Sequence, residues 1–109
     1  MNTQRLSDIS IDDVQLLMPI ELACHSHPWS EVTLTSCIGG RYFGEKLSVN
    51  HVIGFYIGEY IAGEATLMDI CVAPEAQGSG YGRILLDAFI EKCKNKGTER
   101  IFLDVRASN

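Results

Sequence analysis

The chain of 109 residues is long enough for one folded unit, and its 46% hydrophobic and 21% charged residues exclude a disordered segment. Its formal net charge of −5 disfavours a protein that coats nucleic-acid phosphates, because the lysines and arginines are scattered. A basic protein or peptide is the more natural macromolecular partner.

The N-terminal part is predicted to hold a short strand and two helices. Weak alternation indicates a strand from Arg5 to Ile9, and Ser10 to Asp13 resembles the capping box that starts a helix. Pro19 lies inside this first helix, where we expect a kink or a break. Ser30 is predicted to cap a second, shorter helix that Gly39-Gly40 ends.

The middle of the chain is predicted to form an antiparallel meander. β-branched and aromatic residues are frequent at 42–43, 52–57 and 64–72, and turn residues separate these runs. An amphipathic helix from about Tyr81 to Lys96 follows, with Gly97 as its C-terminal cap. We expect the last strand, 100–105, to return by a right-handed crossover and lie parallel to 64–72.

A glycine-rich turn, Gln77 to Arg83, connects the third predicted strand of the meander to this helix. Glycines allow close approach of the backbone to a ligand, and a helix N-terminus attracts anions, so the turn predicts a phosphate site. A Walker A loop is excluded because Arg83-Ile84 replaces its Lys-Ser or Lys-Thr. A nucleophile elbow is excluded because no His follows Ser79. A dinucleotide fingerprint stays open, with Asp104 as its distant acid.

The four cysteines, Cys24, Cys37, Cys71 and Cys93, contain no C-x-x-C pair and predict reduced, buried thiols. Cys24, His25 and His27 stand close in the sequence but lack a second cluster, so we expect no metal. The sequence contains no recognisable signal peptide or membrane span, which favours a cytoplasmic protein.

The turn also matches the pattern Gln/Arg-x-x-Gly-x-Gly/Ala, as Gln77-Gly78-Ser79-Gly80-Tyr81-Gly82. Pro28-Trp29-Ser30, Glu64-Ala65-Thr66-Leu67, Ile70-Cys71-Val72 and Val105-Arg106-Ala107-Ser108-Asn109 surround it in the chain. With these motifs the chain resembles the GCN5-related N-acetyltransferase (GNAT) family along essentially its whole length. The branch it most resembles acetylates N-terminal alanines of ribosomal proteins.

The resemblance implies an α+β fold with a mixed, mostly antiparallel sheet flanked by helices. It implies one N-acetyltransferase domain over residues 1–109 that lacks the last helix and strands of the family. It also implies transfer of acetyl from acetyl-coenzyme A to the N-terminal α-amine of a protein, with a ribosomal protein as the expected partner.

The resemblance further implies the site residues. The cofactor is expected to contact Ile70, Cys71, Val72, Gly78, Ser79, Gly80, Tyr81, Gly82, Arg83 and Asn109. Asp104 stands where the family branch has a catalytic Glu, so we expect it to take the proton from the amine, through a water because Asp is shorter. The family's acid, a Tyr, would lie after the last residue of this chain.

Several alternatives remain open at this stage. The chain is either an active acetyltransferase, a coenzyme A-binding form that turns over poorly, or a small nucleotide-binding oxidoreductase. Asp104 is alternatively a solvated carboxylate, and Trp29 a hydrophobic anchor. Four acids either form a pocket for a cationic N-terminus or are scattered on the surface: Glu21, Glu59, Glu64 and Asp69. Because the last predicted strand lacks its expected neighbours, we expect the protein to form a homo-oligomer through this strand.

Overall fold

The computed structural model describes residues 3–105. It contains β1 (Gln4–Asp8), a 3-10 turn (Ile11–Asp13), α1 (Val14–Cys24), α2 (Glu31–Ser36), β2 (Tyr42–Val49), β3 (His51–Ile61), β4 (Glu64–Val72), a second 3-10 turn (Pro74–Ala76), α3 (Tyr81–Asn95) and β5 (Arg100–Leu103). Asn109, which the sequence predicts to contact the cofactor, lies outside the described residues.

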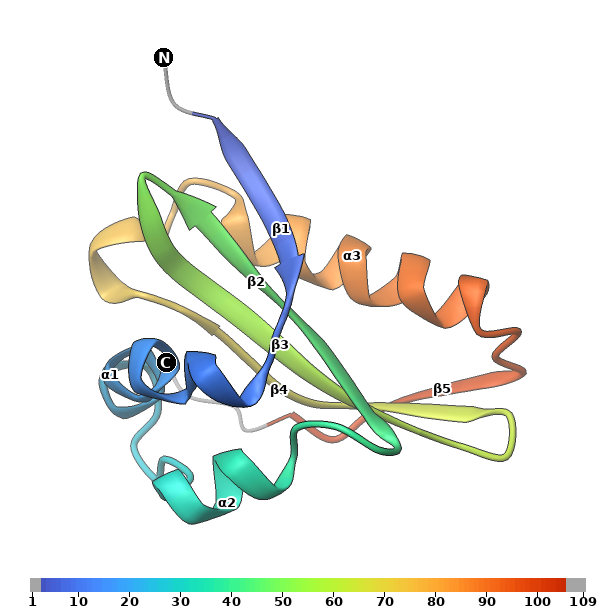
Figure 1. Cartoon of the computed structure of the whole chain (residues 1–109). Coiled ribbons are helices and arrows are strands. Elements are labelled where there is room, and N and C mark those ends of the chain that lie inside the picture. Colours follow the sequence, from blue (N-terminus) through green and yellow to red (C-terminus); the bar gives the residue numbers. More distant parts are fainter. Residues whose placement is uncertain (1–2, 106–109) are drawn as a thin grey trace.

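The strands form one five-stranded sheet in the order β1-β2-β3-β4-β5. The first four pair antiparallel, and β5 pairs parallel with β4 after the α3 crossover (Figure 1). This confirms the mixed, mostly antiparallel sheet that the sequence predicts. It also disfavours the dinucleotide-binding alternative, because that fold is built on a mostly parallel sheet.

Helices cover both faces of the sheet (Figure 1). α1 and α2 lie on one face, where Leu17 and Leu34 are fully buried against β3 and β4. α3 lies on the opposite face and buries Leu85 and Phe89 against the other side chains of the same strands. The sheet is therefore a shared wall between two apolar cores, which holds the ends of α1 and α3 in fixed positions around β4.

The predicted capping box at the start of the first helix is confirmed. The Ser10 amide donates a hydrogen bond to Asp13 Oδ2 at 2.8 Å, and a 3-10 turn leads into α1. Of the kink or break predicted at Pro19, the break is wrong, because α1 continues through this residue to Cys24. Pro19 removes one backbone donor, but Leu17 and Ile20 are buried on either side of it and hold the helix on the sheet.

The meander strands are longer than the residue patterns predict. β2 and β3 meet at Asn50, and β3 and β4 meet at Ala62-Gly63, all with positive φ. The register between β3 and β4 shifts by one residue, since Ile57 pairs with Asp69 but Gly58 pairs with Leu67. The extra residue on β4, Met68, is a β-bulge that the sequence did not reveal.

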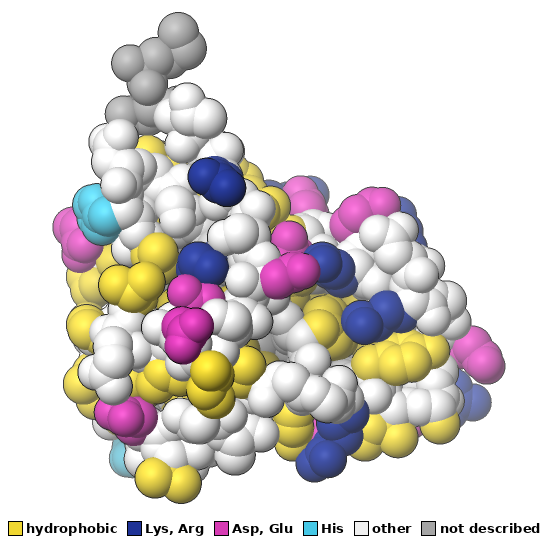
Figure 2. Space-filling view, viewed as in Figure 1, with side chains coloured by type: hydrophobic (Ala, Val, Ile, Leu, Met, Phe, Trp, Pro, Cys, Tyr) yellow, Lys and Arg dark blue, Asp and Glu magenta, His cyan; other side chains and the backbone are white. Residues whose placement is uncertain are grey.

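Charged side chains of both signs mix on the face seen in Figure 2. Ion pairs join Lys46 to Asp13, at 3.0 Å, and Lys92 to Asp8, at 2.9 Å, so these cations do not form a basic surface. None of the helices within residues 3–105 combines the length and the apolar character needed to cross a bilayer.

Candidate active site

The candidate site begins where β4 and β5 separate. Their parallel pairing ends at Leu67 and Leu103, and one further hydrogen bond joins the Asp104 amide to the Leu67 carbonyl at 3.0 Å. β4 continues to Val72 with β3 as its partner on the other side. Within the described residues, the last part of β4 therefore has one open edge.

Backbone groups of β4 face this open edge. The Ala73 amide donates to the Ile53 carbonyl of β3 at 2.7 Å. Because successive residues of a strand direct their N–H and C=O groups to opposite edges, Cys71 also faces β3, whereas Ile70 and Val72 face the opening. Two of the residues predicted to bind the acetyl donor thus present polar backbone groups to an edge that pairs with no strand of the described residues.

The glycine turn lies beyond the end of β4, and it leads into α3. Gly78 and Gly80 both have φ of +86°, a conformation that residues with a Cβ rarely adopt. A Cβ added at Gly78, Gly80 or Gly82 would meet no atom within 4 Å, so the turn faces open space. Because Gly80 caps α3, the first amides of that helix have no partner within it. The turn can therefore bind an anion through backbone N–H groups.

A groove of about 680 Å³ joins these features. Its walls are the end of α1, the end of β4 and the glycine turn: Ala23, Cys24, His25, Ser26, Ile70, Cys71, Val72, Pro74, Ala76, Gln77, Gly78, Gly80, Tyr81 and Gly82. Ser79 and Arg83 stand on the turn but outside this wall, and the Arg83 side chain pairs with Asp87 at 3.2 Å. A smaller cavity of about 260 Å³ lies between β1, β2 and α3, away from the turn.

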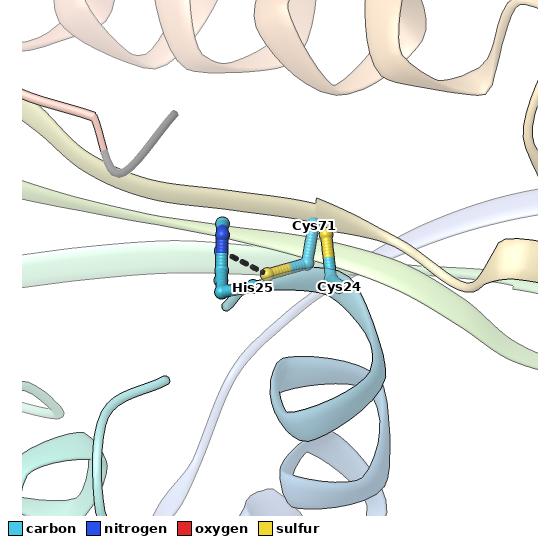
Figure 3. A group of neighbouring side chains, drawn as sticks. All are labelled: Cys24, His25 and Cys71. Atoms are coloured by element: carbon cyan, nitrogen blue, oxygen red, sulfur yellow. Dashed lines mark hydrogen bonds between the residues drawn. The ribbon is translucent and has the colours of Figure 1, made fainter. Parts of the chain in front are cut away.

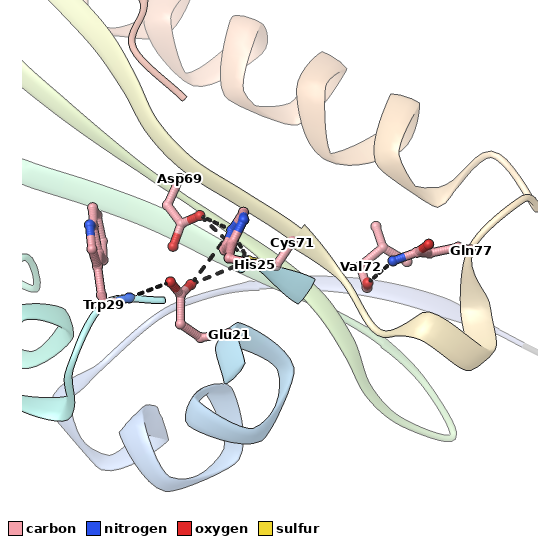
Figure 4. Close-up of polar contacts among 7 residues, drawn as sticks. All are labelled: Glu21, His25, Trp29, Asp69, Cys71, Val72 and Gln77. Atoms are coloured by element: carbon pink, nitrogen blue, oxygen red, sulfur yellow. Dashed lines mark hydrogen bonds and ion pairs between the residues drawn. The ribbon is translucent and has the colours of Figure 1, made fainter. Parts of the chain in front are cut away.

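Gln77 connects the glycine turn to β4. Its Nε2 donates a hydrogen bond to the Val72 carbonyl at 2.9 Å (Figure 4). The side chain thus fixes the start of the turn relative to the strand end. Gln77 belongs to the sequence pattern, but this contact could not be read from it.

Asp104 lies directly after β5, at the point where β4 and β5 separate. Its side chain is exposed, and it does not line the groove. The structure therefore brings Asp104 to the level of the β4 bulge and leaves its catalytic role a prediction.

A buried polar cluster lies behind the groove, between α1 and β4 (Figures 3 and 4). Glu21 lies in the last turn of α1, and His25 directly follows that helix. The other two members, Asp69 and Cys71, come from β4. The exposed fractions of the four are 0%, 7%, 0% and 1%. His25 Nε2 lies 2.8 Å from Asp69 Oδ1 and 3.0 Å from Cys71 Sγ, and Cys71 Sγ lies 3.3 Å from Glu21 Oε1.

The protonation of this cluster follows from its contacts. Burial works to raise the pKa of Glu21, but a side-chain hydrogen bond shared with Asp69 and hydrogen bonds donated by the Trp29 amide and Cys71 outweigh it and lower that pKa. Burial raises the pKa of the Cys71 thiol, and the charges of Asp69 and Glu21 raise it further. Cys71 is therefore a thiol, not a thiolate, when only these side chains surround it.

The sequence analysis found single members of this cluster but not the cluster itself. Of the four acids considered as a pocket, Glu21 and Asp69 come together, whereas Glu59 pairs with Arg41 and Glu64 with Arg100. His27 is exposed and lies outside the cluster. The available signal was spacing: residues 21 and 25 share a helix face, and 69 and 71 share a strand face.

Comparisons with known proteins point in one direction. Residues 14–109 match the model of the acetyltransferase (GNAT) family. The [ribosomal protein bS18]-alanine N-acetyltransferase of Haemophilus influenzae is 41% identical over 95% of this chain and 72% of its own length. The Escherichia coli K12 protein of the same name is 38% identical over 100% of this chain and 73% of its own length. The crystal structure of the E. coli ribosomal-protein-S18-alanine N-acetyltransferase superposes with a TM-score of 0.91 at 36% identity, covering 98% of this chain and 70% of that one.

Proposed function

Because this chain belongs to the acetyltransferase (GNAT) family, we propose that it transfers acetyl from acetyl-coenzyme A to the N-terminal α-amine of a ribosomal protein. Acetyl-coenzyme A is the acetyl donor of this family. The observation that carries the proposal is the groove, in which the open edge of β4 and the N-terminus of α3 face one space.

The groove offers a different contact to each part of the donor. The backbone amides at the N-terminus of α3 suit the pyrophosphate, because they lie at the positive end of the helix dipole. These are the amides of Gly80, Tyr81, Gly82 and Arg83. The open edge at Ile70 and Val72 suits the pantetheine amides, which would add to β4 as a further strand does. An N–H at this edge would also stabilise the charge that gathers on the thioester oxygen during attack.

An α-amine is a suitable nucleophile for a site with a weak base. Its unperturbed pKa of roughly 8 leaves about a tenth of it neutral at pH 7, against well under a thousandth for a lysine near 10.4. We propose that Asp104 removes the proton through a water molecule as the amine attacks. Its position where β4 and β5 separate supports this role.

Acetylation of defined peptides tests the function. One peptide carries the alanine N-terminus of bS18, a second is the same peptide with its N-terminus already acetylated, and both contain an internal lysine. We expect acetyl-coenzyme A-dependent modification of the first peptide only, at its α-amine. Modification of both peptides at lysine, or a thermal shift with NAD but not with acetyl-coenzyme A, would contradict the proposal.

The role of Asp104 has its own test. Asp104→Asn should lower kcat at least about tenfold, because general-base assistance contributes that much or more, and should leave the affinity for acetyl-coenzyme A unchanged. Asp104→Glu should retain most of the rate. Glu99→Gln, which neutralises an exposed acid at the other end of β5, is the matched control. Equal rates for Asp104→Asn and Glu99→Gln would leave Asp104 as a solvated carboxylate.

We further propose that the protein acts in the cytoplasm, where acetyl-coenzyme A and ribosomal proteins occur together, and that copies of it associate through β5. Ile101, Phe102 and Leu103 are large apolar side chains exposed on this strand. β5 is also an edge of the sheet within the described residues, and its outer backbone groups can pair with another strand.

A further inference from the structure

We propose that Glu21, His25, Asp69 and Cys71 form a zinc-binding site, a property that acetyl transfer does not require. Their potential ligand atoms all lie within 4.8 Å of one another. The proposal departs from the sequence-based expectation of no metal, which considered only Cys24, His25 and His27 at the end of α1 and just after it. The fold adds a second pair of ligands from β4.

The distances between the ligand atoms suit a tetrahedral ion. Zinc lies about 2.0–2.3 Å from nitrogen, oxygen and sulfur ligands, which places neighbouring ligands about 3.3–3.7 Å apart. Here Cys71 Sγ lies 3.3 Å from Glu21 Oε1 and 3.5 Å from Asp69 Oδ1. His25 Nε2 lies 2.8 Å from Asp69 and 3.9 Å from Glu21. Side-chain rotations that shift these ligand atoms by a few tenths of an ångström would make room for one ion between them.

The chemistry of the four side chains selects the metal. Magnesium and calcium prefer oxygen ligands alone, and each takes six or more of them. A set of one sulfur, one nitrogen and two oxygens matches the borderline softness of zinc and its four-coordinate geometry. All four ligands come from the protein, so the site is closed and structural rather than catalytic.

Charge favours the same conclusion. Three of the four groups are acids, and they surround a single imidazole in a buried space. Two carboxyl groups placed together in a medium of low dielectric repel each other unless they share a proton, and a divalent cation can take the place of that proton. The zinc-bound form would contain a thiolate at Cys71, two carboxylates and a neutral His25.

The surroundings supply the remaining requirements of a metal site. The Trp29 amide donates to Glu21 Oε2 at 2.8 Å and thereby orients the carboxylate, as outer partners of metal ligands commonly do (Figure 4). His25 and Cys71 line the groove, which provides an entry path for the ion before the acetyl donor binds. Zinc would then join the end of α1 to β4 directly behind the groove.

Zinc titration of the intact chain tests the proposal. The protein is stripped with a chelator under reducing conditions and titrated with Zn²⁺ alone against a colorimetric competitor. We expect one ion per chain. Cys71→Ser should weaken binding at least about a hundredfold, because even the loss of an outer partner costs tenfold to a hundredfold. Cys37→Ser is the matched control, since Cys37 is also buried in this core, and it should bind as the unmodified chain does.

Two further measurements separate this site from its alternatives. Cys24 lies close enough to His25 and Cys71 to form a different, three-residue set, so Cys24→Ser should retain full affinity if the four-residue site is correct. Co²⁺ bound to the unmodified chain should show a thiolate charge-transfer band and a tetrahedral spectrum, which requires no variant to fold. Absence of binding, absence of that band, or equal loss in Cys24→Ser and Cys71→Ser would overturn the proposal.

Discussion

Replacement of Gly80 by alanine tests whether the glycine turn binds the pyrophosphate. Gly80 has φ of +86°, where a residue with a Cβ is strained by about 1–2 kcal/mol. A Cβ at this position would meet no atom within 4 Å beyond its two chain neighbours, so it would face open space at the N-terminus of α3. The new methyl group would therefore act on the ligand and on the turn conformation, not on the core.

The expected loss of affinity can be estimated from one hydrogen bond. A hydrogen bond to a charged group contributes about 1.5–3 kcal/mol, so displacement of the phosphate from one amide should weaken binding about tenfold to a hundredfold. Isothermal titration calorimetry with acetyl-coenzyme A measures this change. Circular dichroism at the temperature of the titration checks that the variant is folded.

Gly97→Ala separates backbone strain from ligand contact. Gly97 has φ of +73° and equally open surroundings, but it follows the opposite end of α3, about 22 Å along the helix axis. It should lose comparable stability and keep full affinity. Wild-type affinity in Gly80→Ala, or an equal loss in both variants, would refute a phosphate site at this turn.

Three further predictions concern stability and assembly. Gly54→Ala should destabilise the fold by about 1–3 kcal/mol in urea, because its Cβ would lie 2.7 Å from the Cys71 carbonyl; an unchanged midpoint would contradict this packing. Burial works to raise the pKa of Asp13, but its bonds to Ser10 and Lys46 lower it, so its stabilisation exists above its ordinary pKa and disappears as pH falls through the lowered value. Asp13→Asn should thus cost about 1 kcal/mol at pH 7 and progressively less as the pH falls through the lowered pKa, and a loss that does not depend on pH would exclude the ion pair. Leu103→Glu should shift sedimentation towards monomer. An unmodified chain that is monomeric at micromolar concentration would contradict association through β5.

Local patterns were sufficient to predict most of the fold. The capping box at Ser10, the cap at Ser30 and the glycines after α2 and α3 act within a few residues, so the sequence reveals them directly. The parallel pairing of β5 with β4 followed from chain connectivity, because two strands joined through one helix usually pair parallel. Pro19 misled the prediction, since tertiary packing of α1 outweighs the loss of one hydrogen bond.

The site was predicted only where it depends on backbone conformation. The glycine turn and the residues Ile70 and Val72 could be named because the motif fixes them along the chain. The bulge at Met68 depends on the register between two strands, which no local pattern encodes. Likewise, Glu21 and Asp69 approach each other only after α1 packs on the sheet.

The connectivity of the sheet has a consequence for the order in which the groove forms and opens. β2, β3 and β4 are joined by short turns, so loop closure between them is cheap and this meander can form early. β5 must wait for α3, has only four residues and buries none of them, so its amides should exchange with solvent before those of β3. The strands β3 and β4 are thus anchored in two cores, whereas β5 and the Asp104 that follows it can open without global unfolding. An acceptor peptide that pairs with β5 would then slow hydrogen exchange there more than anywhere else in the chain.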